Sequence, residues 1–459
     1  DLIDRLVAQD VGIVVLDECH HLLDYWAFIL RELIRALRDV HVVGLTATLP
    51  DPGNQREYEN YNRLLGAVDF EVPTPAVVKE GNLAPYRDLV FFCQPTRREL
   101  AYLKGIQDHF AVAVNEVAAN PFFQDWLLAQ FGDGRAAFQT FLNEQPFLCI
   151  AAVKHLRGQG VALPAGVSLI PEMREPLTVD DWLTLLEQFA LRDLKISPDM
   201  ARQKLYRELR NMLLGFGISI TEAGIRHQRS PGDLVLALSE AKDGAAVRIL
   251  QEEHAALGQR LRAVVITDYE RMSARTRRLK DVLHPEAGSA VRAFRALIAD
   301  SKTNGLDPIL VTGKIVLVDA DKQALLDQGI HQWQAERRLD FAWEWRPTED
   351  PRIVELTGTG RDWRSRTYVA LVTHLFELGL SQCLIGTRGI FGEGWDALSL
   401  NTLIDLTSVT TSTGVQQIRG RTIRLDPAWE KKVAHNWDVV CVSRDFDKGD
   451  ADLHRFVAK

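Results

Sequence analysis

Two short apolar runs near the beginning of the chain, each ending in polar residues, constrain its fold most. Residues 11–16 have the length and β-branched content of a buried strand, and Asp17 and Glu18 follow directly. Residues 41–45 form a second such run, which ends in Thr-Ala-Thr at residues 46–48. Parallel α/β sheets bind ligands at the carboxyl ends of their strands. The two carboxylates therefore lie where one could hold a nucleotide-bound Mg²⁺ and the other could orient an attacking water.

A second pair of features occurs in the last third of the chain. Residues 385–396 (IGTRGIFGEGWD) form a glycine-rich loop after an apolar run, with the carboxylate of Asp396 at its end. Glycine permits positive φ or a close backbone approach in such a loop. Residues 407–424 follow, with a basic stretch that contains Arg421 and Arg424. Spaced three apart on a helix, these arginines share a face, and planar guanidinium groups suit the charge of a transferring γ-phosphoryl group.

Together these stretches resemble the superfamily 2 helicases of the DEXH-box group. Asp17-Glu18-Cys19-His20 matches motif II, and residues 46–48 match motif III. The string Q-x-x-G-R-x-x-R at residues 417–424 matches motif VI, although residue 423 is isoleucine where many members have glycine. The resemblance implies an α/β fold of two RecA-like parallel-sheet lobes and the use of ATP and Mg²⁺.

The resemblance also implies a role for each matching residue. Asp17 would coordinate Mg²⁺, and Glu18 would activate water and contact the metal through it. The catalytic residues would be Asp17, Glu18, His20, Arg421 and Arg424. The nucleotide would be held by Asp17, Glu18, Gly394, Asp396, Gln417, Arg421 and Arg424. Coupling of the nucleotide site to nucleic acid would fall to Thr46, Ala47 and Thr48.

One expected motif is missing from the sequence. No G-x-x-x-x-G-K-[ST] phosphate loop occurs, and only about ten residues precede the acidic strand. Either the chain is a fragment whose phosphate loop lies upstream, or it cannot bind ATP in the usual way. The intact motifs II and III favour the fragment.

Changes in the spacing of apolar residues along the chain predict its domains. Residues 1–96 are expected to be the C-terminal part of the first lobe, with a helix at 55–66, a proline-bounded strand or edge at 68–78 and a short strand before residue 94. Residues 97–230 show helical spacing and are predicted to be a helical insertion. Thr178 and Asp181 form a capping-box variant there. Residues 231–445 form the second lobe, and 446–459 begin a truncated extension. The strands expected in the second lobe are residues 262–267, 308–313, 383–387, 402–407 and 439–442.

The sequence indicates the nucleic-acid contacts less specifically than it indicates the nucleotide site. Residues 269–280 concentrate basic side chains after an expected strand. They could contact a phosphate backbone, but a solvated helix face explains them equally well. The nucleic-acid candidates are Arg271, Arg275, Arg277, Arg278, Thr387 and Thr407. Backbone contacts of this kind give affinity that falls with salt and little sequence preference.

Composition narrows the function classes. The net charge of −8 does not indicate nucleic-acid binding, yet a local basic groove would suffice. Five scattered cysteines form no CxxC pair, which argues against a zinc ribbon, and their usage fits a reducing, cytoplasmic compartment. The two histidines after Glu18 lack HExxH spacing, which argues against a metalloprotease. No apolar run approaches membrane-spanning length.

The sequence therefore predicts an ATP-dependent helicase or translocase that moves along nucleic acid, with DNA favoured over RNA. No membrane partner is expected, and protein partners could bind the helical insertion. The alternative is a nucleic-acid-binding scaffold that has lost turnover. Intact Glu18, Arg421 and Arg424 speak against that alternative.

Overall fold

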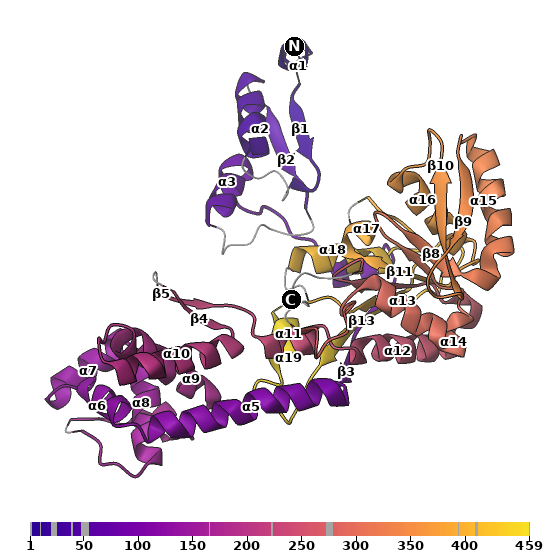
Figure 1. Ribbon diagram of the computed structural model, residues 1–459. Coiled ribbons are helices and arrows are strands. Elements are labelled where there is room, and N and C mark those ends of the chain that lie inside the picture. Colours follow the sequence, from indigo (N-terminus) through magenta and orange to yellow (C-terminus); the bar gives the residue numbers. More distant parts are fainter. Residues whose placement is uncertain are drawn as a thin grey trace.

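The computed structural model describes residues 2–9, 11–19, 25–37, 40–46, 55–164, 166–221, 224–271, 279–392, 394–408 and 412–458. Figure 1 shows a small N-terminal α/β unit, a helical region and a large α/β unit. The predicted fold class, an α/β chain with parallel sheets and a mainly helical insertion, is confirmed. None of the helices within these described ranges is both long enough and apolar enough to cross a membrane.

The N-terminal unit is built on two parallel strands. Its elements are α1 (Leu2–Ala8), β1 (Ile13–Leu16), α2 (Tyr25–Ala36), β2 (His41–Gly44) and α3 (Gln55–Leu65). β1 pairs with β2 in parallel, from Ile13 opposite His41 to Leu16 opposite Gly44. Leu16, Cys19 and Tyr61 form a small core beneath α2 and α3. Both strands and the helix near 55–66 agree with the prediction.

The segment after this unit differs from the prediction. Residues 66–73 are exposed and carry no regular structure, and a short helix follows, α4 (Thr74–Lys79). The expected strand at 68–78 is therefore wrong. Pro75 lies in the first turn of α4, where a proline costs no helical hydrogen bond.

The helical region begins at Thr96, which caps its first helix with a capping box formed with Glu99. A second capping box, Thr178 with Asp181, opens α9 as predicted. A β-hairpin near the end of the region was not predicted. The elements of the helical region are α5 (Arg97–Ala118), α6 (Pro121–Ala129), α7 (Gly134–Glu144), α8 (Pro146–Gly158), α9 (Val179–Phe189), α10 (Met200–Gly215), and the two strands of the hairpin, β4 (Ile218–Thr221) and β5 (Gly224–His227).

The core of the helical region continues into the large unit. Phe123 and Trp126 are buried in it. The same apolar cluster includes Leu236, Cys441 and Phe446 from the chain beyond the insertion. The carboxylate of Glu99, almost fully buried, accepts hydrogen bonds from the hydroxyl of Ser239 (2.7 Å) and the backbone N–H of residue 240 (3.0 Å). The helical region is thus packed firmly onto the large unit.

The large unit contains a nine-stranded sheet in the order β3-β13-β12-β6-β11-β7-β8-β10-β9. The strands from β3 to β7 in this order are parallel, and the remaining pairs are antiparallel. The strands are β3 (Tyr86–Cys93), β6 (Ala263–Thr267), β7 (Ile309–Val311), β8 (Val316–Asp319), β9 (Ala342–Pro347), β10 (Ile353–Thr359), β11 (Cys383–Thr387), β12 (Thr402–Asp405) and β13 (Ala434–Cys441).

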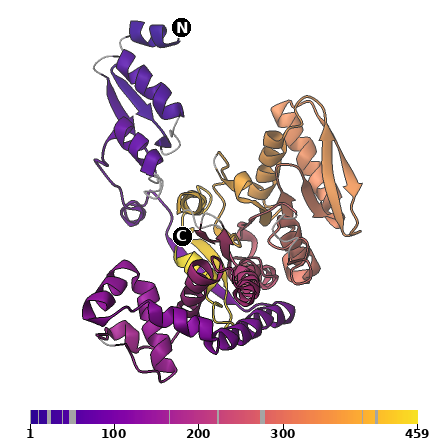
Figure 2. The same cartoon turned by 60° about the vertical axis from the view of Figure 1, so that its left-hand side comes forward.

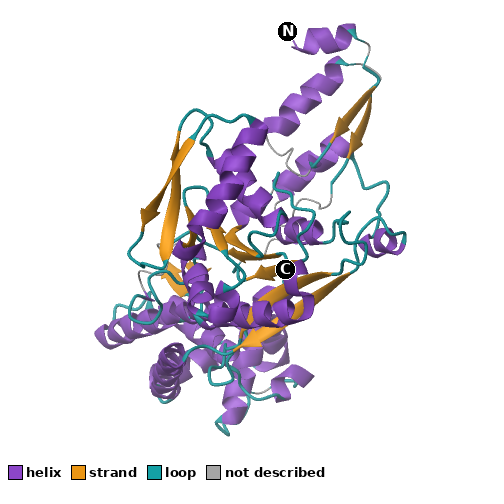
Figure 3. Ribbon diagram, turned by 90° about the vertical axis from the view of Figure 1, so that its right-hand side faces the viewer, coloured by secondary structure: helices purple, strands orange, loops and turns teal. Residues whose placement is uncertain are grey.

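Helices cover both faces of this sheet, as buried parallel strands require. One apolar cluster joins α12 and α13 to one face, and another joins α15, α16 and α17 to the other. Figure 2 and Figure 3 show this arrangement from two further directions. The helices of the unit are α11 (Pro231–Ala237), α12 (Ala241–Leu257), α13 (Ala290–Ala299), α14 (Ser301–Asn304), α15 (Gln323–Arg337), α16 (Ser365–Glu377), α17 (Arg388–Phe391), α18 (Ser412–Thr422) and α19 (Ala451–Val457).

Two features of the large sheet differ from the prediction. β3, expected at the end of the first lobe, pairs instead with β13 over its whole length, from Tyr86 opposite Ala434 to Cys93 opposite Cys441. An apolar strand pattern says nothing about its partner, which explains the error. The antiparallel strands β8, β9 and β10 were not predicted, although the five expected strands are present at or near their expected positions.

Candidate functional site

The Asp17–Glu18 pair lies at the carboxyl edge of the N-terminal sheet. Both side chains are exposed, directly after β1. The backbone N–H of Cys19 donates to the carbonyl of Leu45 (3.1 Å), so the segments after the two strands stay side by side. Thr46, half-buried, therefore lies at the same edge as the carboxylates. The structure thus places the described residues of the predicted motifs II and III at one edge of the sheet.

Glu18 has an unusual backbone conformation. Its φ of 48° lies in the left-handed region, which non-glycine residues seldom adopt. Its N–H donates to Oδ1 of Asp17 (3.0 Å). Such strain costs about 1–3 kcal/mol and is retained where the surrounding structure enforces it, often at functional sites. The turn directs two adjacent carboxylates away from the strand into solvent.

Cys19 anchors this turn from below. It is fully buried, and its Sγ lies 3.7 Å from the hydroxyl of Tyr61 on α3. Burial, together with the Cys19 thiol, raises the pKa of Tyr61 to about 12. The third residue of the Asp-Glu-Cys-His string is therefore a core contact, which holds the carboxylates at the sheet edge.

One face of the N-terminal sheet carries exposed apolar side chains. Ile13 and Val15 alternate with the covered Val14 and Leu16 and are 62% and 57% exposed. Val43 and Leu45 on the neighbouring strand are exposed as well. Parallel strands normally have both faces covered. This face is therefore suited to burial against another element.

The second constellation, which consists of the glycine-rich loop (385–396) and the basic stretch (407–424), begins after β11 in the large sheet. α17 ends at Phe391, and the loop that follows includes Gly394 with a φ of 76°. A side chain at residue 394 would meet no neighbour, so this glycine is required for its φ alone. Trp395 is buried, packs against Phe391 at 4.9 Å between ring centroids, and donates from Nε1 to the hydroxyl of Thr373 (2.8 Å). The loop is thereby fixed onto α16.

Arg421 holds this loop from the other side. It lies in the last turn of α18 and is 9% exposed. Its guanidinium donates to the backbone carbonyls of Gly392 and Trp395. In this conformation Arg421 connects the helix of the Q-x-x-G-R-x-x-R string to the glycine-rich loop.

Arg424 is placed differently. α18 ends at Thr422, so Arg424 lies beyond the helix, and the helix face that the two arginines were expected to share does not exist. Its Nη1 forms an ion pair with Oδ1 of Asp396 (2.5 Å), and the two side chains are 43% and 49% exposed. The structure therefore pairs an arginine of the predicted motif VI with the carboxylate at the end of the glycine-rich loop.

Lys432, which was not predicted, contacts the predicted site. Its Nζ donates to the carbonyls of Leu398 (2.7 Å) and Arg424 (2.8 Å), and the side chain is almost fully buried. Burial lowers its pKa to about 8. Lys432 thus ties the backbone of Arg424 to the segment after Asp396. Nothing in the local string WEKKV distinguishes this lysine from a surface residue.

The nucleic-acid candidates are dispersed. Thr407 is buried, and its N–H donates to Oδ1 of Asp405 (2.7 Å). Thr387 is half-buried, and Arg271 is exposed shortly after β6. Gln417, which was predicted to hold the nucleotide, is half-buried as well. The remaining candidates lie outside the described residues, as do parts of motifs II and III: His20, Ala47, Thr48, Arg275, Arg277 and Arg278.

A polar network beside Thr407 was also missed. The N–H of Ser408 donates to Oδ2 of Asp268 (2.8 Å), and Arg229 donates to both the hydroxyl and the carbonyl of Ser408. Burial raises the pKa of Asp268. Arg455 donates to the carbonyl of Thr407 (2.8 Å). These contacts join segments that are distant in sequence, which no local pattern reveals.

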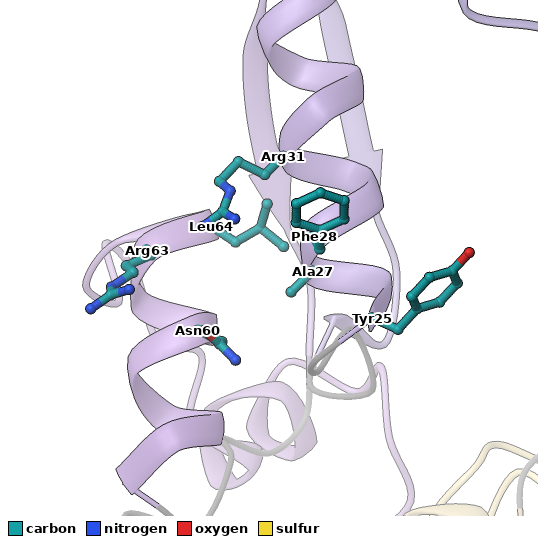
Figure 4. A pocket seen from close by; sticks show the side chains of 7 residues that line it. All are labelled: Tyr25, Ala27, Phe28, Arg31, Asn60, Arg63 and Leu64. Atoms are coloured by element: carbon teal, nitrogen blue, oxygen red, sulfur yellow. The ribbon is translucent and has the colours of Figure 1, made fainter.

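A cavity of about 490 Å³ lies in the N-terminal unit, between α2 and α3. In Figure 4, Phe28 and Arg31 come from one helix and Arg63 and Leu64 from the other. None of the predicted catalytic residues lines it. Tyr25, at its rim, is 69% exposed.

The fold and these two constellations define an α/β protein with acidic and glycine-rich strand ends. Among solved structures it is similar to the helicase domain of Pyrococcus furiosus Hef, with 14% identity, a TM-score of 0.38, and coverage of 100% of this chain and 77% of that one. It is similar to a fragment of a putative HsdR subunit of a type I restriction enzyme from Vibrio vulnificus YJ016, with 12% identity, a TM-score of 0.34, and coverage of 95% and 46%.

A third similar structure is the C-terminal part of the Fun30 ATPase domain, with 10% identity, a TM-score of 0.28, and coverage of 82% of this chain and 90% of that one. No family model and no curated protein matches the sequence. At these TM-scores the likeness alone decides neither fold nor function.

Proposed function

We propose that this chain is part of an ATP-dependent helicase or translocase of the DEXH-box type, which moves along nucleic acid, DNA rather than RNA. The observation that carries the proposal is the contact between the two halves of the second constellation. Arg421 and Arg424, from the Q-x-x-G-R-x-x-R string, both contact the glycine-rich loop, through Gly392, Trp395 and Asp396. Strings separated in sequence thus meet at the carboxyl edge of a parallel sheet, where phosphate ligands bind.

The first constellation, Asp17 and Glu18 with Thr46 beside them, is chemically suited to Mg²⁺. Asp17 offers an exposed carboxylate, the hard oxygen ligand that this ion prefers. Within the described ranges, no group of three or more His, Cys, Asp or Glu side chains could hold a metal. Mg²⁺ is commonly held by one or two carboxylates together with substrate phosphates, so the donor set agrees with a metal carried in with ATP. Glu18, adjacent on the strained turn, would orient the attacking water.

The two arginines have separate roles in this proposal. The ion pair of Arg424 with Asp396 is about half exposed, so breaking it costs roughly 0–1 kcal/mol. Arg424 can therefore exchange its carboxylate for a phosphoryl oxygen. Arg421, buried and bonded to two carbonyls, keeps the loop in place. Closure of the N-terminal unit on the large unit would bring Arg424 to the phosphates near Asp17 and Glu18.

The test is steady-state ATP hydrolysis with saturating single-stranded DNA or RNA. Since the sequence holds no phosphate loop, the 459-residue chain should hydrolyse ATP at background rate, and a version extended by a phosphate-loop segment should be stimulated by nucleic acid. In the extended protein, Arg424→Ala should lower kcat by about 10³–10⁵ and change nucleotide affinity only a few-fold. Robust turnover by the 459-residue chain, abolished in Glu18→Gln, would contradict the need for that segment. Near-normal kcat in Arg424→Ala would contradict the mechanism.

The alternative is a nucleic-acid-binding scaffold without turnover, and the missing phosphate loop is the observation that favours it. The same assay separates the two. Salt-dependent binding of nucleic acid with background hydrolysis in the extended protein would support the scaffold. Stimulated hydrolysis would exclude it.

A further inference from the structure

An aromatic pocket that contains no residue of either constellation lies on the antiparallel extension of the large sheet. Figure 1 shows this extension, the strands β8, β9 and β10. The pocket's cavity of about 430 Å³ is lined by α15 and the edge strand β9. Trp343 and Trp345 alternate with exposed residues along β9 and therefore share one face of the sheet. The lining residues are Asp327, His331, Phe341, Ala342, Trp343 and Trp345.

The two indoles converge on a single carboxylate. Nε1 of Trp343 donates to Oδ1 of Asp327 (2.8 Å), and Nε1 of Trp345 donates to the same oxygen (2.9 Å). His331, one helical turn after Asp327, meets Trp343 edge-on at 4.5 Å between ring centroids. Phe341 lies 5.8 Å from Trp343 and completes the aromatic wall.

The charge of the pocket is not balanced within it. Asp327 makes no ion pair with any residue that the structure describes, and neither lysine nor arginine lines the cavity. Two neutral indole donors orient the carboxylate but leave its negative charge. The aromatic faces add the negative side of their quadrupoles. A cation is therefore attracted to this pocket, whereas the phosphates of a nucleic acid would be repelled.

We propose that this pocket binds an organic cation of the alkylammonium class, above all a quaternary ammonium group. Such a group is weakly hydrated and fits aromatic walls with a carboxylate at the base. A cavity of this size falls in the range of small-ligand sites. The group could be carried by a free choline-like molecule or by a methylated lysine side chain, and the experiment distinguishes these sources.

The test uses the whole chain and compares choline with its neutral isostere 3,3-dimethylbutan-1-ol, at ionic strength held constant with NaCl. Binding is followed through the indole ¹H–¹⁵N signals, which Trp343→Phe and Trp345→Phe assign. The two indole signals should shift with choline, with an affinity about tenfold higher than for the isostere. A trimethyllysine tripeptide, titrated in parallel, identifies the source by whether it binds more tightly than choline.

Variants separate charge from shape. Asp327→Asn keeps the size of the side chain but removes its charge, and should reduce the preference for choline over the isostere several-fold, leaving the part that the aromatic faces contribute. Glu344→Gln, on the opposite face of β9, is the matched control and should preserve it. If Asp327→Asn fails to fold, the comparison of the two ligands on the wild-type chain still decides. Equal affinity for choline and the isostere, or no indole shift at about 50 mM choline, would overturn the proposal.

Discussion

Replacing Arg421 by alanine should destabilise the large unit far more than replacing Arg424, although both arginines belong to one motif. Arg421 is 9% exposed, and its guanidinium donates to two backbone carbonyls, those of Gly392 and Trp395. A hydrogen bond with a charged donor contributes about 1.5–3 kcal/mol, and the loss of one partner leaves a buried group unsatisfied. Because the two bonds share one donor group, we expect a combined loss of about 2–4 kcal/mol rather than the full sum.

Arg424 gives the matched comparison. Its ion pair with Asp396 joins two side chains that are 43% and 49% exposed. Exposed pairs of this kind contribute about 0–1 kcal/mol. Arg421→Lys should fall between the two alanine variants, because a single ammonium group cannot reproduce the planar fork that reaches both carbonyls.

The assay is urea unfolding followed by tryptophan fluorescence. A chain with several units need not unfold in one step, so the transition that contains Trp395 is identified first with Trp395→Phe. With a slope of about 3 kcal/mol/M, Arg421→Ala should lower the midpoint of that transition by about 1 M and Arg424→Ala by less than about 0.3 M. Equal shifts for the two variants would refute the assignment of Arg421 as the residue that holds the loop.

Two further predictions follow from burial and exposure. Lys432 has a folded-state pKa lowered to about 8 from 10.5, so between these values the unfolded chain binds more protons, and the free energy of unfolding should rise with pH. The rise, measured by urea unfolding from pH 7.5 to 10, should exceed that of Lys432→Met, and identical slopes would contradict it. Limited digestion with thermolysin should cut first within residues 66–73, where Phe70 is 83% exposed. A first cut at residues 96–100 is not expected, because Glu99 is buried there, and finding it would refute this packing.

Local patterns in the sequence predicted the elements that depend on local chemistry. The apolar runs before Asp17 and after residue 382 are strands, and Thr178 caps its helix through Asp181. The antiparallel strand β9 was missed although Trp-Glu-Trp-Arg alternates as a half-buried strand does, because the run is short and ends in a proline. The same limit explains why β3 was assigned to the wrong sheet, since its partner β13 lies more than three hundred residues away.

Side-chain roles at the candidate site were predicted less well, because a string specifies residue types but not their partners. The spacing of Arg421 and Arg424 suggested one helix face and one shared task. The end of α18 at Thr422 separates them. No feature of the string indicates where the helix stops, since the residues that end it are packed against distant segments: Thr422 donates to the side chain of Asn436 on β13 (2.8 Å).

Lys432 explains how the half-exposed Arg424 can still be well positioned. Its Nζ fixes the backbone carbonyl of Arg424, so the main chain at that residue is held although its guanidinium reaches solvent. A side chain attached to a fixed backbone loses less conformational entropy when it binds a ligand, which is the advantage of preorganisation. Asp396, the ion-pair partner of Arg424, lies two residues before Leu398. Lys432 also fixes the carbonyl of Leu398, so it holds both segments of the pair. The arginine that we propose to bind phosphate would therefore depend on a buried lysine, and Lys432→Met should weaken the transition-state contribution of Arg424 as well as the fold.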